Sequence, residues 1–478
     1  MIALSLTEVA RATGGRVVTP EGVDPDGVVV DGPVVTDSRE AGPGSLYVAR
    51  VGQHADGHDF VAGARERGAV AALVSRPVGD LPVVVVDDTE VAFGLLAREV
   101  VTRVPGLEVV GITGSSGKTS TKDLLGAVLA TVGPTVAPIG SYNSEIGVPL
   151  TVCRVTAGTR FLVVEMGARG IGHVAHLARV APPRVGVVLN VGTAHVGEFG
   201  SREAIARAKS ELVAALPAGG LAVLNADDAA VRAMASVTAA RVVLVGEADD
   251  ADLRATDVSL DAGGRPTFTV ESATGSRSLT LGLVGRHHVG NALAVLAVAL
   301  ELGMPFEQAC AALESARAAS RWRMEVTERA DGVTVVNDAY NANPDSMRAA
   351  LTALERMGQG RRTWAVLGTM LELGEESSAL HAEVGADVAA HAVDELLVVG
   401  DAASPLADGA RAATASATGG GTASGRTTRT RLVPDAEAAE TLLREELRSG
   451  DVVLFKSSRD AGLRLLGDRL AGPREELT

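Results

Sequence analysis

Cysteine is nearly absent from this chain of 478 residues. Only Cys153 and Cys310 occur, and they form no CxxC pair. Two thiols cannot make a disulfide framework or a four-cysteine zinc site. We therefore expect a protein of a reducing compartment, with the cytoplasm as its location.

Long apolar runs, aromatic residues and an excess of positive charge are also lacking. No apolar run approaches the length of a bilayer span, and the opening MIALSLTEVARATGG lacks the basic start of a secretion signal. Aromatic residues make up 3% of the chain, and 44 Lys plus Arg against 59 Asp plus Glu give a net charge of −15. Such acidity repels polyanions. We expect no membrane span and no nucleic-acid partner, although a small phosphorylated ligand in a local basic pocket remains compatible.

The length and the pattern of apolar residues indicate an α/β protein of about three domains. Short apolar strands alternate with helical stretches from the N-terminus to Pro105-Gly106, where the chain is punctuated. Strand-like runs that end in polar residues follow, as in a doubly wound parallel sheet. A second boundary near Trp322 precedes four further strands of a Rossmann-like unit. We predict domains at 1–105, 106–321 and 322–478.

One segment breaks the pattern of the third domain. Residues 403 to 432 are rich in Ala, Gly, Ser and Thr and show no apolar period. This composition predicts a mobile surface loop.

The sharpest motif is GITGSSGKTS, between a Val-rich strand and a helix. Small residues let backbone N–H groups face phosphate oxygens, Lys118 can reach terminal phosphates, and Thr119 can bind magnesium. Ile112 stands where the longer GxxxxGK[ST] pattern has its first glycine, so the motif is the shorter GxxGKT form. The candidate phosphate-binding residues are Gly114, Ser115, Ser116, Gly117, Lys118, Thr119 and Ser120.

Three further candidates are weaker when each stands alone. Glu165 ends the apolar strand FLVVEMG, where a carboxylate is costly unless it is paired or binds a cation, although it could also cap a backbone N–H. His195 follows a strand and is compatible with an ordinary hydrogen-bonded loop. Lys209, in SREAIARAKSELV, has the pattern of a solvated lysine.

Polar residues also end the strands of the third domain. Turn chemistry accounts for most of them, and only Asp338 and Lys456 suggest more. The sequence contains no recognisable Ser-His-Asp catalytic motif and no His/Cys motif of a metal site.

These motifs together resemble the ATP-dependent Mur ligases of peptidoglycan synthesis, and the resemblance covers almost the whole chain. It is carried by GSSGKTS, GSYNSEIGVPLT, VVEMGARGIGHVAHLARVAPP, AHVGEFGSREAIARAKSEL, GRHHVGNALA, NDAYNANPDSM, LGTMLELGEES and FKSSR. The DNPR motif usual in the ligase that adds the third residue is not found. The resemblance implies an N-terminal UDP-sugar-binding domain, a central ATPase domain and a C-terminal Rossmann-like domain that closes over ATP.

The resemblance also assigns roles to residues. Lys118, Glu165, His195 and Lys209 become catalytic residues; Thr119 and Glu165 become magnesium ligands, His195 lies near a second metal, and Lys209 is carbamylated to an anion that helps hold a cation. ATP contacts are implied for Asn291, at the adenine, and for Arg323 and Asp338. Substrate contacts are implied for Ser38, Arg39, Tyr47, Asn143, Tyr340, Asn341, Lys456 and Ser458.

The implied substrates are UDP-N-acetylmuramoyl-tripeptide and D-alanyl-D-alanine, and we expect a monomer. The tripeptide carboxylate would attack the γ-phosphate of ATP, and the dipeptide amine would then displace phosphate from the acyl phosphate. Two alternatives remain open: another amide ligase of this fold, such as a sister Mur ligase or a folylpolyglutamate-synthetase-like enzyme, and a nucleotide-binding protein without turnover.

Overall fold

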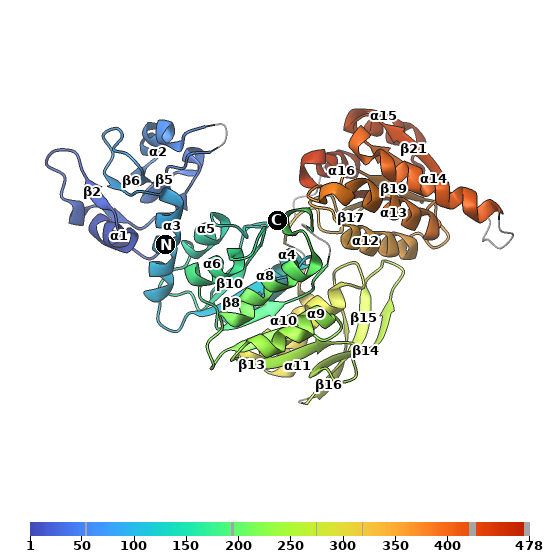
Figure 1. The fold of residues 1–478 in the computed structure, drawn as a ribbon, viewed down its shortest axis with the longest axis horizontal. Helices are drawn as coiled ribbons and strands as arrows, with labels where there is room; N and C mark the ends of the chain where they lie inside the picture. The colour runs from blue at the N-terminus through green and yellow to red at the C-terminus, as the bar shows by residue number, and fades with distance from the viewer. Residues whose placement is uncertain (53–54, 193–195, 274, 318, 420–426, 473–478) are drawn as a thin grey trace.

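Three lobes, each built on its own sheet, make up the molecule (Figure 1). The computed structural model describes residues 1–52, 55–192, 196–273, 275–317, 319–419 and 427–472. The N-terminal and C-terminal lobes flank the central lobe, and the overall class is mixed α/β with three domains. The predicted fold class is confirmed.

The N-terminal lobe contains a mostly parallel sheet in the order β2-β7-β6-β5-β4, with only β2 antiparallel to its neighbour, and a separate β1-β3 pair. Its strands are β1 (Leu4–Ser5), β2 (Arg16–Val18), β3 (Val29–Val30), β4 (Val34–Val35), β5 (Ser45–Val48), β6 (Ala69–Val74) and β7 (Val83–Val85). Its helices are α1 (Leu6–Thr13), η1 (Pro25–Gly27), η2 (Ser38–Glu40), η3 (Gly57–Phe60), α2 (Val61–Glu66) and α3 (Thr89–Thr102).

The central lobe contains the largest sheet, in the order β16-β15-β14-β13-β12-β11-β8-β10-β9, which is parallel from β14 to β9. Its strands are β8 (Glu108–Thr113), β9 (Thr135–Val136), β10 (Phe161–Glu165), β11 (Val185–Val188), β12 (Leu221–Asn225), β13 (Arg241–Gly246), β14 (Leu253–Leu260), β15 (Pro266–Ser272) and β16 (Gly275–Thr280). Its helices are α4 (Lys118–Ala130), α5 (Gly147–Val152), α6 (His173–Val180), α7 (Val196–Phe199), α8 (Arg202–Ala214), α9 (Ala229–Arg232), η4 (Ala233–Val237), α10 (His288–Glu301) and α11 (Phe306–Ser315).

The C-terminal lobe contains a sheet in the order β17-β18-β22-β19-β20-β21, in which only β17 is antiparallel. Its strands are β17 (Glu325–Glu328), β18 (Thr334–Asn337), β19 (Thr363–Leu367), β20 (Glu395–Val399), β21 (Arg429–Val433) and β22 (Val452–Lys456). Its helices are α12 (Pro344–Met357), η5 (Gly374–Glu376), α13 (Ser377–Ala390), η6 (Asp401–Ala403), α14 (Ser404–Gly419), α15 (Ala436–Glu446), η7 (Arg459–Ala461) and α16 (Leu463–Ala471).

A continuous apolar core joins the N-terminal lobe to the central one. One buried cluster includes Phe93 and Leu96 of α3, Val148 of α5 and Leu177 of α6. Arg98 of α3 also donates a hydrogen bond to the carbonyl oxygen of Arg179, at 3.0 Å. The two lobes therefore share side chains that are costly to expose, which fixes their mutual orientation.

The predicted loop at 403 to 432 is wrong for most of its described residues. Residues 404–419 form α14, and β21 begins at Arg429. The buried face of α14 is made of Leu406, Ala407 and Ala410. Alanine has the highest helix propensity but contributes little to an apolar period, so the pattern of apolar residues did not predict the helix. The strands β17 and β21 were also missing from the prediction of four C-terminal strands. Residues 420–426 lie outside the described part of the chain.

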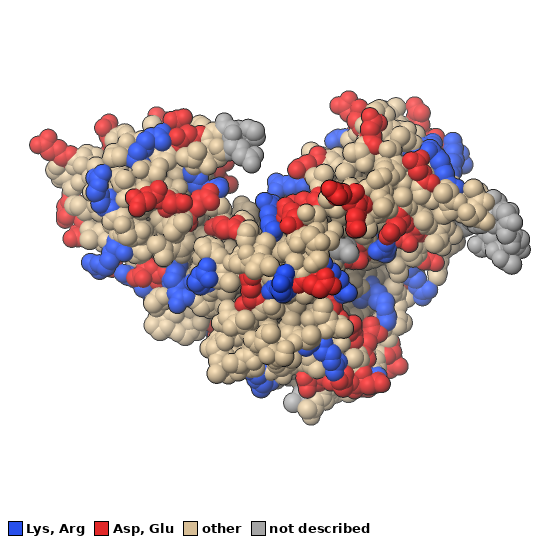
Figure 2. Space-filling view, in the orientation of Figure 1, with Lys and Arg blue, Asp and Glu red and all other residues tan. Residues whose placement is uncertain are grey.

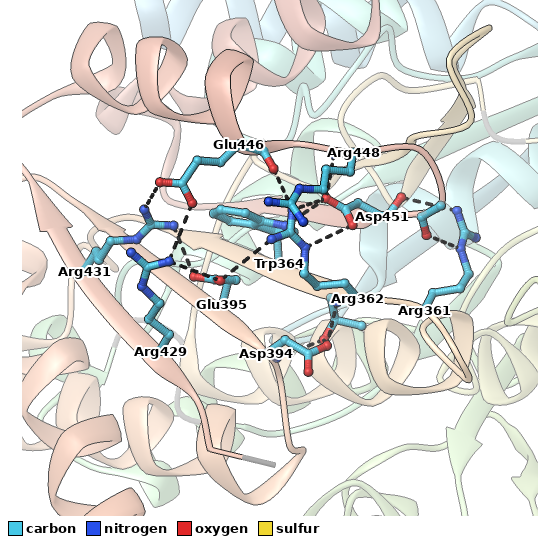
Figure 3. Close-up of polar contacts among 12 residues, drawn as sticks. Arg361, Arg362, Trp364, Asp394, Glu395, Arg429, Arg431, Glu446, Arg448 and Asp451 are labelled. Carbon is cyan, nitrogen blue, oxygen red and sulfur yellow. Dashed lines mark hydrogen bonds and ion pairs between the residues drawn. The ribbon is translucent and has the colours of Figure 1, made fainter.

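A polar network closes the amino ends of the C-terminal parallel strands (Figure 3). The Trp364 side chain is fully buried between the guanidinium groups of Arg362 and Arg431, which lie 5.0 and 5.2 Å from its ring centre. Asp451 accepts hydrogen bonds from Arg362 Nη2 at 2.6 Å and from Trp364 Nε1 at 3.2 Å. This carboxylate therefore ties β19 to β22 at the edge opposite their carboxyl ends.

We expect Asp451→Ala to lower the free energy of unfolding by about 3 kcal/mol, because it removes the carboxylate that pairs with the partly buried Arg362 and accepts from the buried Trp364 indole N–H, and the Glu446 carbonyl oxygen replaces it only in part. Urea unfolding measures this change. Asp331→Ala, which breaks an exposed pair with Arg329, is the control and should cost less than about 1 kcal/mol. Equal losses in the two variants would show that the network does not stabilise the lobe.

Among the described residues, no helix has both the length and the apolar character that crossing a membrane requires.

Candidate active site

The phosphate loop links β8 to α4 at the carboxyl ends of the central parallel strands. Gly117 precedes α4 with φ 80°, and a Cβ atom there would lie 2.8 Å from Asn291 Oδ1, so glycine is required on both counts. Asn190, just beyond β11, accepts hydrogen bonds from the backbone N–H groups of Ser115 and Ser116 through Oδ1, both at 2.9 Å. The loop is thereby held open at the helix N-terminus, where anions bind.

Lys118 and Thr119 begin α4 beside the buried Glu165. Lys118 Nζ donates to the carbonyl oxygen of Gly114 at 2.7 Å, and burial lowers the pKa of its ammonium while the Glu165 charge opposes that shift. Thr119 Oγ1 donates to Glu165 Oε2 at 2.9 Å. Lys118, whose ammonium could bind terminal phosphates, thus lies beside the oxygen atoms of Thr119 and Glu165, which could bind a divalent cation.

Glu165 ends β10 with no exposed surface and is held in place by its neighbours. Its Oε1 accepts from Ser141 Oγ at 2.9 Å and from Asn143 Nδ2 at 2.7 Å. The oxygen atoms of Glu165, Thr119 and Ser141 are the hard ligands that magnesium prefers. No group of three His, Cys, Asp or Glu side chains gathers as a metal site in the described residues. A magnesium ion here would therefore complete its coordination with oxygen atoms from outside the protein, such as those of phosphate or water.

Lys209 lies on α8 and is only 3% exposed. Burial lowers the pKa of its amine to about 7, and the nearby charge of Lys118 adds to the shift. The sequence around Lys209 is typical of a solvated helix face, but its side chain is desolvated. A large fraction of its amine is therefore neutral at neutral pH.

The C-terminal lobe brings a second set of charges to the phosphate loop. Lys456, at the end of β22, pairs with Asp338 Oδ2 at 2.5 Å, and burial lowers the pKa of its ammonium although Asp338 opposes this. Arg323 lies 4.3 Å from the centre of the Tyr340 ring, and its Nη2 donates to Thr119 Oγ1 at 3.3 Å. Residues at and just before the C-terminal lobe therefore lie against the start of α4.

A cavity of about 830 Å³ receives residues from all three lobes, and Figure 2 shows the molecule hollowed between the N-terminal and C-terminal lobes. The predicted residues that line it are Ser115, Ser116, Gly117, Lys118, Thr119, Ser120, Asn143, Glu165, Lys209, Arg323, Asp338, Tyr340, Asn341, Lys456 and Ser458. An ion pair of the N-terminal lobe, Arg50 with Glu90 at 2.6 Å, also lines it. Residues far apart in sequence are thus gathered around one volume.

Asn291 lines an adjoining cavity of about 400 Å³. Its apolar floor includes Leu189, Val289 and Ala294, and its amide groups include Asn190 and Asn225. His287 lines both cavities, and burial lowers the pKa of its imidazole to about 4, so the ring is neutral at pH 7. An apolar slot with amide groups beside a phosphate loop suits a flat heteroaromatic base.

The other predicted residues lie elsewhere. Gly114 is in the loop but lines neither cavity, and neither do Ser38 and Arg39 of η2 or Tyr47 of β5. The Tyr47 hydroxyl donates to the carbonyl oxygen of Gly57 at 2.9 Å, and burial raises the pKa of Tyr47 to about 12. His195 lies outside the described residues.

Sequence reasoning missed three contributions to this site. Asn190 was visible only as a polar residue after a strand, and Ser141 only as part of the segment after the phosphate helix. Nothing local marks the pair of Arg50 and Glu90, because the two residues meet across the N-terminal lobe.

Comparisons with known proteins agree along the whole chain. Three family models match: the Mur ligase family catalytic domain at residues 33–98, the Mur ligase middle domain at 112–299, and the Mur ligase glutamate ligase domain at 322–459. The chain is 48% identical over 500 residues to the UDP-N-acetylmuramoyl-tripeptide--D-alanyl-D-alanine ligase of Mycobacterium tuberculosis, covering 98% of each. A crystal structure of MurF from Acinetobacter baumannii matches with TM-score 0.86 and 30% identity, covering 98% of this chain and 99% of that one. The MurF ligase of Thermotoga maritima in complex with ADP matches with TM-score 0.78 and 30% identity over 92% and 97%.

Proposed function

The chain belongs to the Mur ligase family, and we propose on that basis that it joins D-alanyl-D-alanine to UDP-N-acetylmuramoyl-tripeptide with the use of ATP. The observation that carries the proposal is the 48% identity to a ligase of that name over 98% of each chain. The reaction makes UDP-N-acetylmuramoyl-pentapeptide, a precursor for peptidoglycan. The predicted family and enzyme class are confirmed.

ATP would bind where the two cavities meet. The phosphate loop faces the larger cavity, and the apolar slot around Asn291 suits the adenine. The tripeptide carboxylate attacks the γ-phosphorus and ADP leaves; the dipeptide amine then attacks the acyl phosphate, loses a proton, and inorganic phosphate departs. Lys118, Arg323 and Lys456 offset charge on the phosphate oxygen atoms, because positioning and electrostatics supply most of the catalysis in such transfers. Closure of the lobes keeps water from the acyl phosphate.

Thr119 and Glu165 would hold a magnesium ion, which supplies charge neutralisation between the phosphate groups when bound. The fully buried carboxylate with hydroxyl neighbours fits that ion. Lys209 would be carbamylated: its neutral amine adds to carbon dioxide and releases a proton, which gives an anion in place of a cation. The pKa of about 7 supports this, since the neutral amine is the reacting form. His195 stays a prediction as a residue near the second metal.

The UDP end of the substrate would lie in the N-terminal lobe, with Ser38, Arg39 and Tyr47 as its predicted contacts. The large cavity extends from the phosphate loop to Arg50 and Glu90 of that lobe, which leaves a path for the peptide. The proposed domains are residues 1–105, 106–321 and 322–478, and the proposed oligomeric state is a monomer.

Phosphate release from magnesium-ATP tests the function. We expect release only when UDP-N-acetylmuramoyl-tripeptide and D-alanyl-D-alanine are both present, with the pentapeptide product confirmed by mass spectrometry. The control replaces the dipeptide by glutamate or by a single D-alanine. Release with a different amine would indicate a sister ligase, and saturable ATP binding without release would indicate a binding protein.

A further inference from the structure

No lysine of this protein lies on its exposed surface. The chain has only four lysines, Lys118, Lys122, Lys209 and Lys456, among its 44 basic residues. None of the four is exposed. Lys118, Lys209 and Lys456 line the large cavity, whereas Lys122 lines neither cavity and has no role in the function proposed above.

Lys122 and Asp123 form a buried ion pair on α4. Their Nζ and Oδ1 atoms are 2.5 Å apart, and both side chains are 3% exposed. Lys122 Nζ also donates to Ser320 Oγ at 3.2 Å, while the Ser320 backbone N–H donates to Asp123 Oδ2 at 2.9 Å. Ser320 belongs to the linker between α11 and β17, so the pair holds the chain at the junction of the central and C-terminal lobes.

The same lysine holds a second part of the active site. Its Nζ donates to the carbonyl oxygen of Pro138 at 2.7 Å. The segment that follows Pro138 carries Ser141 and Asn143, which donate hydrogen bonds to Glu165. One ammonium group therefore joins the phosphate helix, the segment beside Glu165 and the interdomain linker.

The linker touches α4 at a second point. Arg323 Nη2 donates to Thr119 Oγ1, and Thr119 and Asp123 are one helical turn apart on α4. Between these contacts Trp322 has φ 59°, and Met324 beyond them has φ 51°, conformations that bulky residues adopt only where their surroundings enforce them. Met324 N–H donates to Asp338 Oδ1 at 3.0 Å, which fixes the far end of the linker in the C-terminal lobe. A shift at Ser320 would therefore displace Arg323.

We propose that Lys122 and Asp123 are positioning residues that anchor the interdomain linker on α4 and so set the place of Arg323 over the phosphate loop. Their part in catalysis rests on the proposed function, whereas the anchoring itself does not. They act through the linker and not on the substrate, because neither lines the large cavity around the phosphate loop or the cavity around Asn291.

The test is the double variant Lys122→Met/Asp123→Leu, compared with the wild-type chain. Replacing both members of a buried pair by apolar residues of similar volume is often neutral for stability, but this variant also deprives the Ser320 N–H and the Pro138 carbonyl oxygen of their partners. We therefore expect a folded protein whose melting temperature is a few degrees lower. We expect kcat to fall about 10- to 100-fold, while KM for ATP changes less than about threefold, since misplacing one catalytic group affects the chemical step more than nucleotide binding. Hydrogen exchange of the nucleotide-free protein should become faster at residues 319–324 and stay slow within α4.

Ser320→Ala is the second variant, since it removes the hydroxyl acceptor and leaves both charges in place. It should lower kcat about threefold and speed exchange at the linker. Thr131→Ala, which removes a hydroxyl at the far end of α4, is the matched control and should change neither. Unchanged kcat together with unchanged linker exchange in the folded double variant would overturn the proposal, and if that variant does not fold, the same outcome in Ser320→Ala would do so. The two proposals can fail separately. If the wild-type protein shows no dipeptide-dependent phosphate release but the variants exchange faster at the linker, the proposed function is refuted and the anchoring role of Lys122 and Asp123 stands.

Discussion

Lys118→Ala is expected to lower kcat by at least about a thousandfold at saturating magnesium-ATP. Lys118 is the cation of the phosphate loop, and burial in the cavity strengthens its interaction with any anion that replaces water there. Its ammonium donates a hydrogen bond to the Gly114 carbonyl oxygen at 2.7 Å, which holds it within the phosphate loop. Steady-state phosphate release in the presence of both other substrates measures the loss.

Two comparisons separate this loss from misfolding. The melting temperature of Lys118→Ala should stay at or above that of the wild type, because a desolvated ammonium is removed. Lys118→Arg keeps the charge but places it on a wider planar group, so it should retain more activity than alanine and less than lysine. Near-wild-type turnover of Lys118→Ala at saturating ATP would refute the assignment of the phosphate loop.

The phosphate loop was predictable because its chemistry is local. GxxGKT between a strand and a helix specifies a turn, a helix N-terminus and a lysine within a few residues, and the structure places Lys118 at the start of α4. Glu165 was predictable by position, since it ends a strand parallel to the one that leads into the loop. Parallel strands place their carboxyl ends on one edge of a sheet, so their terminal residues converge.

Other parts of the site depend on contacts that no local pattern contains. Lys209 is buried because α8 packs on the central sheet, whereas the sequence of α8 alone predicts a solvated lysine. The contact of Arg323 with Thr119 joins residues 204 positions apart and depends on how the linker crosses α4. The helix α14 failed to appear in the pattern because its buried face is mostly alanine. Only the resemblance to a family suggested a role for Lys209 before its environment was known.

Lys209→Met is expected to separate stability from activity. The pKa of Lys209 is lowered from 10.5 to about 7, so between these values the unfolded chain binds more protons than the folded one, and stability rises with pH across that window. Below pH 7 the wild-type protein bears the full cost of a buried ammonium, which methionine removes at similar volume. In buffer free of carbon dioxide, the variant should therefore melt at a higher temperature than the wild type at pH 6, and the difference should shrink as the pH rises toward 10.

The same variant should lose at least about a hundredfold in kcat, because methionine cannot form a carbamate and leaves the cation site without that anion. The wild type should in turn lose activity below pH 7, where the ammonium does not add carbon dioxide, and when bicarbonate is removed at constant pH. Lys209→Arg is the second variant, because arginine keeps a cation in the pocket but cannot be carbamylated. If the reaction needs only a positive charge at this position, the arginine variant would retain activity and the methionine variant would lose it. If arginine supports near-wild-type turnover, or if bicarbonate has no effect, Lys209 acts as a cation, and the carbamate has no part in the reaction.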